Sequence, residues 1–180
     1  LMAIERLLAP KGHWYVFYDP FQYLSFGDEY LDEFCDKGFF LYRLTQNMRN
    51  TDFISKVIMQ VIEEPIDSSY LKGIKGRLPL FVIAPPNDYD FSIREEYANL
   101  IYEQGVDSKQ ITVLTLCTEG DSRIGKRTKN QFDQFTTARK FKGLENEILF
   151  IVDVNGNHFK QPELRRLLYV AMSRARSYVI

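Results

Sequence analysis

A strand–helix–strand pattern at the C-terminal end of the chain constrains the fold most. The apolar segment Glu147–Val152 predicts a strand, Pro162–Met172 predicts a helix, and Ser177–Ile180 predicts a short final strand. Apolar residues of the helix recur at intervals of three and four and form one face, which consists of Leu164, Leu167, Leu168, Ala171 and Ala175. This order of elements is typical of a parallel sheet with helices packed on it.

The same alternation extends over the rest of the chain. Further strands are predicted at His13–Tyr18, Phe39–Leu44, Leu80–Ala84, Ile111–Thr115 and Phe132–Thr137. Further helices are predicted at Tyr30–Lys37, Thr51–Glu63 and Ser92–Glu103, and loops at Glu64–Arg77 and Glu119–Asn130. We therefore predict an α/β fold with a mainly parallel sheet covered on both faces. Such sheets bind ligands at the carboxyl ends of their strands, where we expect Gln22, Arg49 and Gly143.

The composition is that of one compact domain. With 45% hydrophobic and 14% aromatic residues, the 180-residue chain is not disordered and is long enough to bury a core. No apolar run approaches membrane-spanning length, and no signal peptide is recognisable at Leu1. Cys35 and Cys117 lack metal or redox spacing, as in ordinary thiols of a cytoplasmic protein. Because the net charge is −1, any surface for nucleic acid must be local.

Arg174 falls at the margin of the apolar face of the C-terminal helix. Arg165, Arg166 and Ser173 are expected to point to the opposite side. A guanidinium at the edge of a packed face requires an anionic partner, because its desolvation is costly. That partner is either a nearby carboxylate or a nucleotide polyphosphate, and the Gly turn and Glu of the upstream segment 142–145, KGLE, favour the polyphosphate.

Four segments resemble motifs of the superfamily I DNA helicases of the Rep, UvrD and PcrA type. The sequence KGLE at 142–145 is similar to motif V, and RRLLYVAMSRA at 165–175 is similar to motif VI. Upstream, LTQNMRNT at 44–51 resembles motif IV. YVFYDPFQ at 15–22 resembles motif III, with Tyr18 in place of the usual Gly. The four segments follow in the order of the family.

The resemblance implies a three-layer RecA-like domain of the P-loop NTPase type, the second motor domain of an ATP-dependent DNA helicase or translocase. It assigns residues 1–27 to the tail of the first RecA-like domain and residues 28–180 to the second. No GxxxxGK[ST] loop occurs in the sequence. ATP with Mg²⁺ is therefore expected to be held by a first RecA-like domain of the same parent chain, and these residues alone are not expected to hydrolyse ATP. The interval from Asp52 to Thr136 indicates a compact member without the large accessory domain.

The resemblance also assigns residues to a phosphate site. Arg49 and Arg174 would reach the γ-phosphate across the cleft between the two motor domains, as arginine fingers do. Gln22 would sense that phosphate, next to Asp19 of the same motif.

A sugar and base site is implied beside it. Glu145 would accept a hydrogen bond from a ribose hydroxyl, and the turn at Gly143 would allow close approach. Met48 occupies the place of the Tyr that stacks on adenine in the family, and a thioether also packs on a ring.

Single-stranded DNA is the partner that the resemblance implies, without a membrane. The residues assigned to it are Thr137, Arg139, Phe26, Lys126 and Arg127, with Lys129 beside them. A solvated loop explains the basic run equally well, and a Phe is more often part of a core.

Two other functions remain open. A domain that kept the fold and lost the motor would bind nucleic acid without catalysis, which Met48 and the missing motif III Gly favour. A degenerate RecA-like domain would instead serve as a protein-interaction platform. The presence of both arginines, Gln22 and KGLE argues against each of these, because a scaffold does not need phosphate-facing groups.

Overall fold

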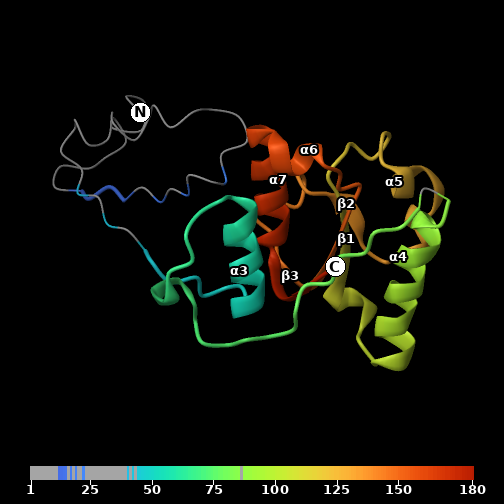
Figure 1. The fold of residues 1–180 in the computed structure, drawn as a ribbon, viewed down its shortest axis with the longest axis horizontal. Helices are drawn as coiled ribbons and strands as arrows, with labels where there is room; N and C mark the ends of the chain where they lie inside the picture. Colours follow the sequence, from blue (N-terminus) through green and yellow to red (C-terminus); the bar gives the residue numbers. More distant parts are fainter. Residues whose placement is uncertain are drawn as a thin grey trace.

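A four-stranded parallel sheet forms the centre of the fold (Figure 1). The computed structural model describes residues 12–15, 17, 19, 22, 40, 42, 44–85 and 87–180. The strands are β1 (Ile111–Thr115), β2 (Phe135–Thr137), β3 (Asn146–Val152) and β4 (Ala175–Val179). Their order in the sheet is β2-β1-β3-β4, and every neighbouring pair is parallel.

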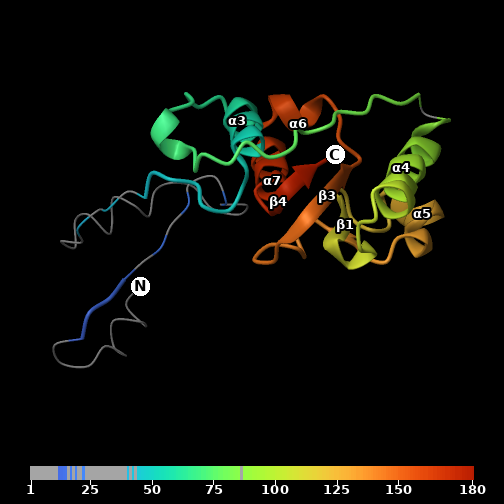
Figure 2. The ribbon, with the colours of Figure 1, turned by 90° about the horizontal axis from the view of Figure 1, so that it is seen from below.

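Helices lie on both faces of this sheet. The longer ones are α3 (Asp52–Val61), α4 (Tyr89–Ala98) and α7 (Pro162–Met172). The shorter ones are α5 (Arg123–Arg127), α6 (Asn157–Lys160), η2 (Ser68–Tyr70), η3 (Asn99–Glu103), η4 (Ser108–Gln110) and η5 (Lys129–Gln131). In two perpendicular views, α3 and α7 lie on one side of the strands and α4 and α5 on the other (Figures 1 and 2). The fold is thus the expected three-layer α/β arrangement of a RecA-like domain.

Alternating side chains of the strands build two cores. Leu114 of β1 and Leu149 of β3 pack with α3 and α7, whereas Val113 and Phe150 pack with α4 and α5. The four side chains are at most 1% exposed. Because both faces of the sheet are buried, β1 and β3 are continuous apolar runs, as in other parallel sheets.

Most predicted elements with strong periodicity are confirmed. The bounds of β1 and α7 coincide with the prediction, and β3 begins one residue earlier than predicted. The predicted loop at Glu119–Asn130 is wrong from Arg123 onward, because it contains α5 and the beginning of η5. The first turn of α5 is capped by Ser122, whose hydroxyl accepts from the N–H of Gly125 at 3.0 Å. Lys126 and Arg127 are therefore helical.

The end of α7 differs from the prediction. Ala175, expected on the apolar face of the helix, is the first residue of β4, because the helix ends at Met172. Ser173, expected to point to solvent, is only 6% exposed. Its hydroxyl donates to the carbonyl of Val170 at 2.9 Å, which allows the side chain to be buried.

The predicted strand Leu80–Ala84 is not formed in the described structure. The N–H of Leu80 donates to the carbonyl of Val179 at the edge of β4, at 3.0 Å. Pro79 and Pro85 flank the segment and have no N–H to donate, which limits a ladder there.

Several predictions concern the N-terminal part of the chain. Of the predicted strands His13–Tyr18 and Phe39–Leu44, residues 13–15, 17, 40, 42 and 44 are described, and they are not in strands. The predicted helix Tyr30–Lys37, Phe26, Cys35 and the boundary between residues 27 and 28 lie outside the described residues. No helix in the described part of the chain combines the length and the apolarity needed to cross a bilayer.

Candidate functional site

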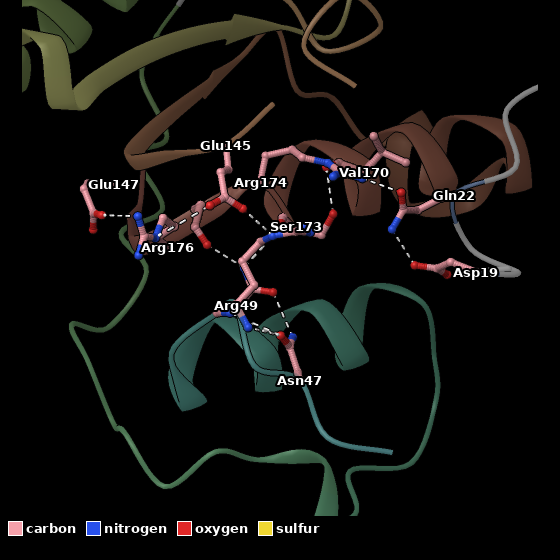
Figure 3. Close-up of polar contacts among 12 residues, drawn as sticks. Asp19, Gln22, Asn47, Arg49, Glu145, Glu147, Val170, Ser173, Arg174 and Arg176 are labelled. Carbon is pink, nitrogen blue, oxygen red and sulfur yellow. Dashed lines mark hydrogen bonds and ion pairs between the residues drawn. The ribbon is translucent and has the colours of Figure 1, made fainter. Parts of the chain in front are cut away.

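A cluster of arginine and acidic side chains lies at the amino ends of β3 and β4 (Figure 3). Glu145 directly precedes β3, Arg174 directly precedes β4, and the two strands are in register at these ends. Arg49 reaches the cluster from the loop before α3. We expected the ligand site at the carboxyl ends of the strands. That expectation is wrong for this cluster, because its charged residues lie in the turns that lead into β3 and β4, at the amino ends of these strands.

Arg174 is buried, with 4% of its surface exposed. Its Nη2 donates to Oε1 of Gln22. Its Nε is fully buried and has no hydrogen-bond partner among the residues that the structure describes. Burial, followed by the positive charge of Arg49, lowers the pKa of Arg174. A buried cation with an unfilled donor favours an incoming anionic acceptor.

Arg49 is partly exposed and lies between two partners. Its Nε donates to Oε2 of Glu145 at 2.7 Å, and its Nη1 approaches the carbonyl of Ser173 at 3.5 Å. Lys72 Nζ donates to the backbone carbonyl of Arg49 at 2.9 Å. The Arg49 guanidinium is thus held at the same edge as Arg174, close enough for the two charges to repel each other.

Asn50 fixes the loop that carries Arg49, and it is not among the predicted site residues. The side chain is 2% exposed. Its Nδ2 donates to the carbonyls of Ala175 at 2.5 Å and Ser173 at 3.3 Å, and its Oδ1 accepts from Asn47 at 2.8 Å. The only signal in the sequence is a pair of Asn residues three positions apart around Arg49.

Asp19 and Gln22 lie against the C-terminal half of α7. Gln22 Nε2 donates to Oδ2 of Asp19 at 2.5 Å, and the hydroxyl of Tyr169 donates to the same oxygen at 3.1 Å. Burial and the negative charge of Asp19 raise the pKa of Tyr169. Lys142 Nζ donates to the carbonyl of Gln22 at 3.1 Å, so the motif III and motif V segments also meet.

An open hollow of about 430 Å³ adjoins Arg49 and Glu145. Its lining consists of Met48, Arg49, Thr51, Lys72, Ile74, Glu145, Glu147, Arg176 and Ser177. Met48 is 71% exposed at its rim. Gly143 precedes Glu145 with a φ of +92°, a conformation that favours glycine. The volume is in the range of sites for small organic ligands.

Among the residues assigned to DNA, those described below lie toward the carboxyl ends of the strands, opposite the arginine cluster. Thr137 ends β2 beside Thr115, which ends β1, and Arg139 follows in an exposed turn. Thr137 is buried and accepts from the N–H of Lys140 at 3.2 Å. Lys126 and Arg127 lie on α5, where Arg127 Nη1 is 3.7 Å from a carboxylate oxygen of Asp90. The residues assigned to the nucleotide and the described residues assigned to DNA therefore lie at opposite ends of the strands.

Asp153 organises the carboxyl ends of the strands and is also not among the predicted site residues. It follows β3 with a φ of +62°. Its carboxylate accepts from the hydroxyls of Thr115 at 2.5 Å and Ser122 at 2.7 Å and from the N–H of Arg123 at 3.3 Å. The backbone N–H of Asp153 donates to the hydroxyl of Tyr89, whose pKa burial raises to about 12. The signal in the sequence is an Asp directly after a buried strand.

Comparisons with known proteins agree with this fold and with the resemblance of its C-terminal segment. Residues 135–180 match the family model of the UvrD-like helicase C-terminal domain. The structure is similar to that of the C-terminal domain of a possible DNA helicase from Lactobacillus plantarum WCFS1. The two share 17% sequence identity with a TM-score of 0.52, over 73% of this chain and 83% of that chain. No curated protein matches the sequence significantly. Residues 135–180 are therefore similar to the C-terminal domain of UvrD-like helicases, and the described structure has the fold of such a domain.

Proposed function

We propose that this chain is the C-terminal part of an ATP-dependent DNA helicase or translocase, to which it supplies an arginine finger and a surface for single-stranded DNA. The observation that carries the proposal is the Arg174 guanidinium, which is buried with its Nε unfilled within the described structure. Arg49 stands at the same edge. Two neighbouring cations with spare donors suit a polyphosphate better than a single carboxylate.

In this proposal, two domains of the parent protein contact the phosphates of ATP. A first RecA-like domain of the parent protein binds ATP with Mg²⁺. The described residues of this chain contain no group of three or more His, Cys, Asp or Glu side chains placed to hold a metal ion. Arg49 and Arg174 approach the γ-phosphate and stabilise the charge on the transferring phosphoryl group, an effect of about 10³–10⁵ in rate.

Gln22 connects Arg174 to the preceding segment of the chain. Its amide oxygen accepts from Arg174, and its nitrogen donates to Asp19 at 2.5 Å. Loss of the γ-phosphate would change the hydrogen bonding of Arg174 and therefore of Gln22. This chain of contacts is a physical route by which hydrolysis shifts one motor domain relative to the other.

The hollow beside Glu145 is the proposed site of the nucleoside. The carboxylate of Glu145 accepts from a ribose hydroxyl, and Gly143, with a φ of +92°, forms the turn that precedes Glu145. Met48 at the rim packs on the base.

Single-stranded DNA is proposed to bind at the opposite edge of the sheet. Arg139, Lys126 and Arg127 contact its phosphates, and Thr137 shapes the turn that presents Arg139. In this proposal, nucleotide and DNA bind at opposite ends of the strands of one sheet.

The test is ATP hydrolysis by the full-length protein with and without single-stranded DNA. Turnover that rises strongly with DNA supports the proposal. Tight, salt-sensitive DNA binding without turnover identifies a retired motor that only binds nucleic acid. If the protein shows neither turnover nor DNA binding, the proposal is wrong and a protein-interaction role takes its place.

A further inference from the structure

We propose that Arg176 is a positioning residue that holds Glu145 for recognition of the nucleotide sugar. The inference rests on the proposed function and adds a specificity determinant to it. Arg176 lies outside the segment 165–175 that resembles motif VI, and it lines the hollow together with Glu145 and Glu147.

The first observation is a row of alternating charges along the hollow (Figure 3). The two carboxylate oxygens of Glu145 face different arginines: Oε2 is 2.7 Å from Arg49 Nε, and Oε1 is 3.9 Å from Arg176 Nε. Arg176 Nη1 is in turn 3.2 Å from Oε1 of Glu147. Glu145 thus lies between two arginines, hydrogen-bonded to Arg49 and within ion-pair distance of Arg176.

The second observation is a β-bulge that aims Arg176 at this row. The pairs that fix the register of β3 and β4 are Asn146 with Ala175 and Ile148 with Tyr178. Between them, one β3 residue, Glu147, lies opposite two β4 residues, Arg176 and Ser177. Glu147 binds both, since Ser177 Oγ donates to its Oε2. Bulges are rare in parallel pairs and frequently re-aim side chains next to functional sites.

Arg49 and Arg176, the two arginines beside Glu145, differ in whether they remain there during the catalytic cycle. Arg49 comes from a loop and, in the proposed function, turns toward the γ-phosphate. It cannot then hold Glu145 in one orientation throughout the cycle. Arg176 is on a strand of the central sheet and is itself fixed by Glu147. It is therefore the partner that keeps the Glu145 carboxylate directed at the sugar when Arg49 moves.

A purely structural role explains these contacts less well. Arg176, Glu145 and Glu147 have side chains that are 55%, 43% and 33% exposed. Exposed ion pairs contribute little to stability because water and salt screen them. Replacement of Arg176 is therefore expected to leave folding intact and to act on ligand recognition.

The experiment compares ATP, 2′-deoxy-ATP and 3′-deoxy-ATP as substrates of the full-length protein with single-stranded DNA present. The wild-type protein is expected to disfavour the analogue that lacks the hydroxyl bound by Glu145. Arg176→Ala is expected to raise KM for ATP about tenfold with kcat changed less than twofold, the loss of one charge-assisted contact. KM for the disfavoured analogue should stay unchanged, so the sugar preference disappears.

Three variants make the result specific. Arg176→Lys keeps the charge and is expected to restore part of the preference, and Glu147→Gln to weaken it. Arg166→Ala, a change of the same type on α7, should leave the preference as in the wild type. If the wild-type protein does not distinguish the three nucleotides, or if Arg176→Ala keeps the preference, the inference is overturned. Absence of ATP turnover in the wild-type protein would instead overturn the proposed function.

Discussion

Replacement of Asn50 by Ala is expected to destabilise the protein and to disturb Arg49 at the same time. Asn50 is 2% exposed and connects the loop before α3 to the turn between α7 and β4. Its Nδ2 donates to two backbone carbonyls, of Ser173 and Ala175. Ala removes both hydrogen bonds and leaves a small void. Asn50 does not have a positive φ, so Ala can adopt its backbone conformation.

The size of the effect follows from the groups left without a partner. A buried polar group that loses its hydrogen bond costs about 1–3 kcal/mol. The hydrogen bond to Ala175, at 2.5 Å, is shorter than the one to Ser173, at 3.3 Å, so the loss at Ala175 dominates. We therefore expect Asn50→Ala to lower the free energy of unfolding by about 2–4 kcal/mol, from the two lost bonds and the void.

Urea denaturation followed by far-UV circular dichroism measures this change. Gln46→Ala is the matched control, because Gln46 also donates to a backbone carbonyl, that of Leu71 at 3.2 Å, but is exposed. Its expected effect is below about 0.5 kcal/mol. Equal midpoints for Asn50→Ala and Gln46→Ala would refute the reasoning. A second readout is ATP turnover of the full-length protein, which should fall in Asn50→Ala because its Arg49 is no longer fixed.

Two further predictions concern stability. Burial lowers the pKa of His158, against the opposing charge of Asp153, and its Nδ1 accepts from the N–H of Asn155 at 3.1 Å. The unfolded state therefore binds more protons below pH 6.5, so stability falls as the pH decreases from 6.5 toward the lowered pKa. Urea midpoints across that range should show this slope, and His158→Gln should remove it; an unchanged slope would contradict the assignment. Gly125→Ala should cost about 1–3 kcal/mol, because its Cβ would lie 2.4 Å from the carbonyl oxygen of Glu119. Gly156→Ala, where no atom lies within 4 Å of the added Cβ, should be close to neutral in the same urea titration. If Gly125→Ala and Gly156→Ala had equal free energies of unfolding, the predicted clash at Gly125 would be contradicted.

The central fold was predictable because its elements carry strong local patterns. The bounds of β1 and α7 follow from a continuous apolar run and a clear helical period. The segment Leu80–Ala84 has the composition of a strand, yet a strand also needs a partner ladder, which flanking prolines restrict. The helix α5 has five residues and no apolar period, and its cap at Ser122 is the main local cue.

The charged centres of the site were predictable from motif resemblance, but their supports were not. Arg49 pairs with Glu145, and Arg174 lies close enough to Arg49 for their charges to interact. Asn50 acts through backbone carbonyls more than 120 positions away, which no local pattern reveals. The role of Arg176 depends on a bulge whose position is set by the register of two strands.

The location of the site was predicted at the wrong edge for a similar reason. Parallel sheets commonly bind ligands at the carboxyl ends of their strands, and here Asp153 organises those ends. Its carboxylate accepts hydrogen bonds from two hydroxyls and a backbone N–H. The arginine cluster is instead built from turns that enter β3 and β4. The sequence shows which turns carry charged residues. The end of the sheet at which each turn lies can be known only from the order and direction of the strands.

The most direct test of the central claim is the rate of DNA-stimulated ATP hydrolysis in the full-length Arg174→Ala variant at saturating ATP. Loss of an arginine finger is expected to lower kcat by about 10³–10⁵ while the affinity for ATP changes only a few-fold, because the contact is strongest in the transition state. Arg166→Ala, on the same helix, should keep the wild-type rate. A near-normal kcat in Arg174→Ala would contradict the account, since its buried guanidinium would then have no part in catalysis.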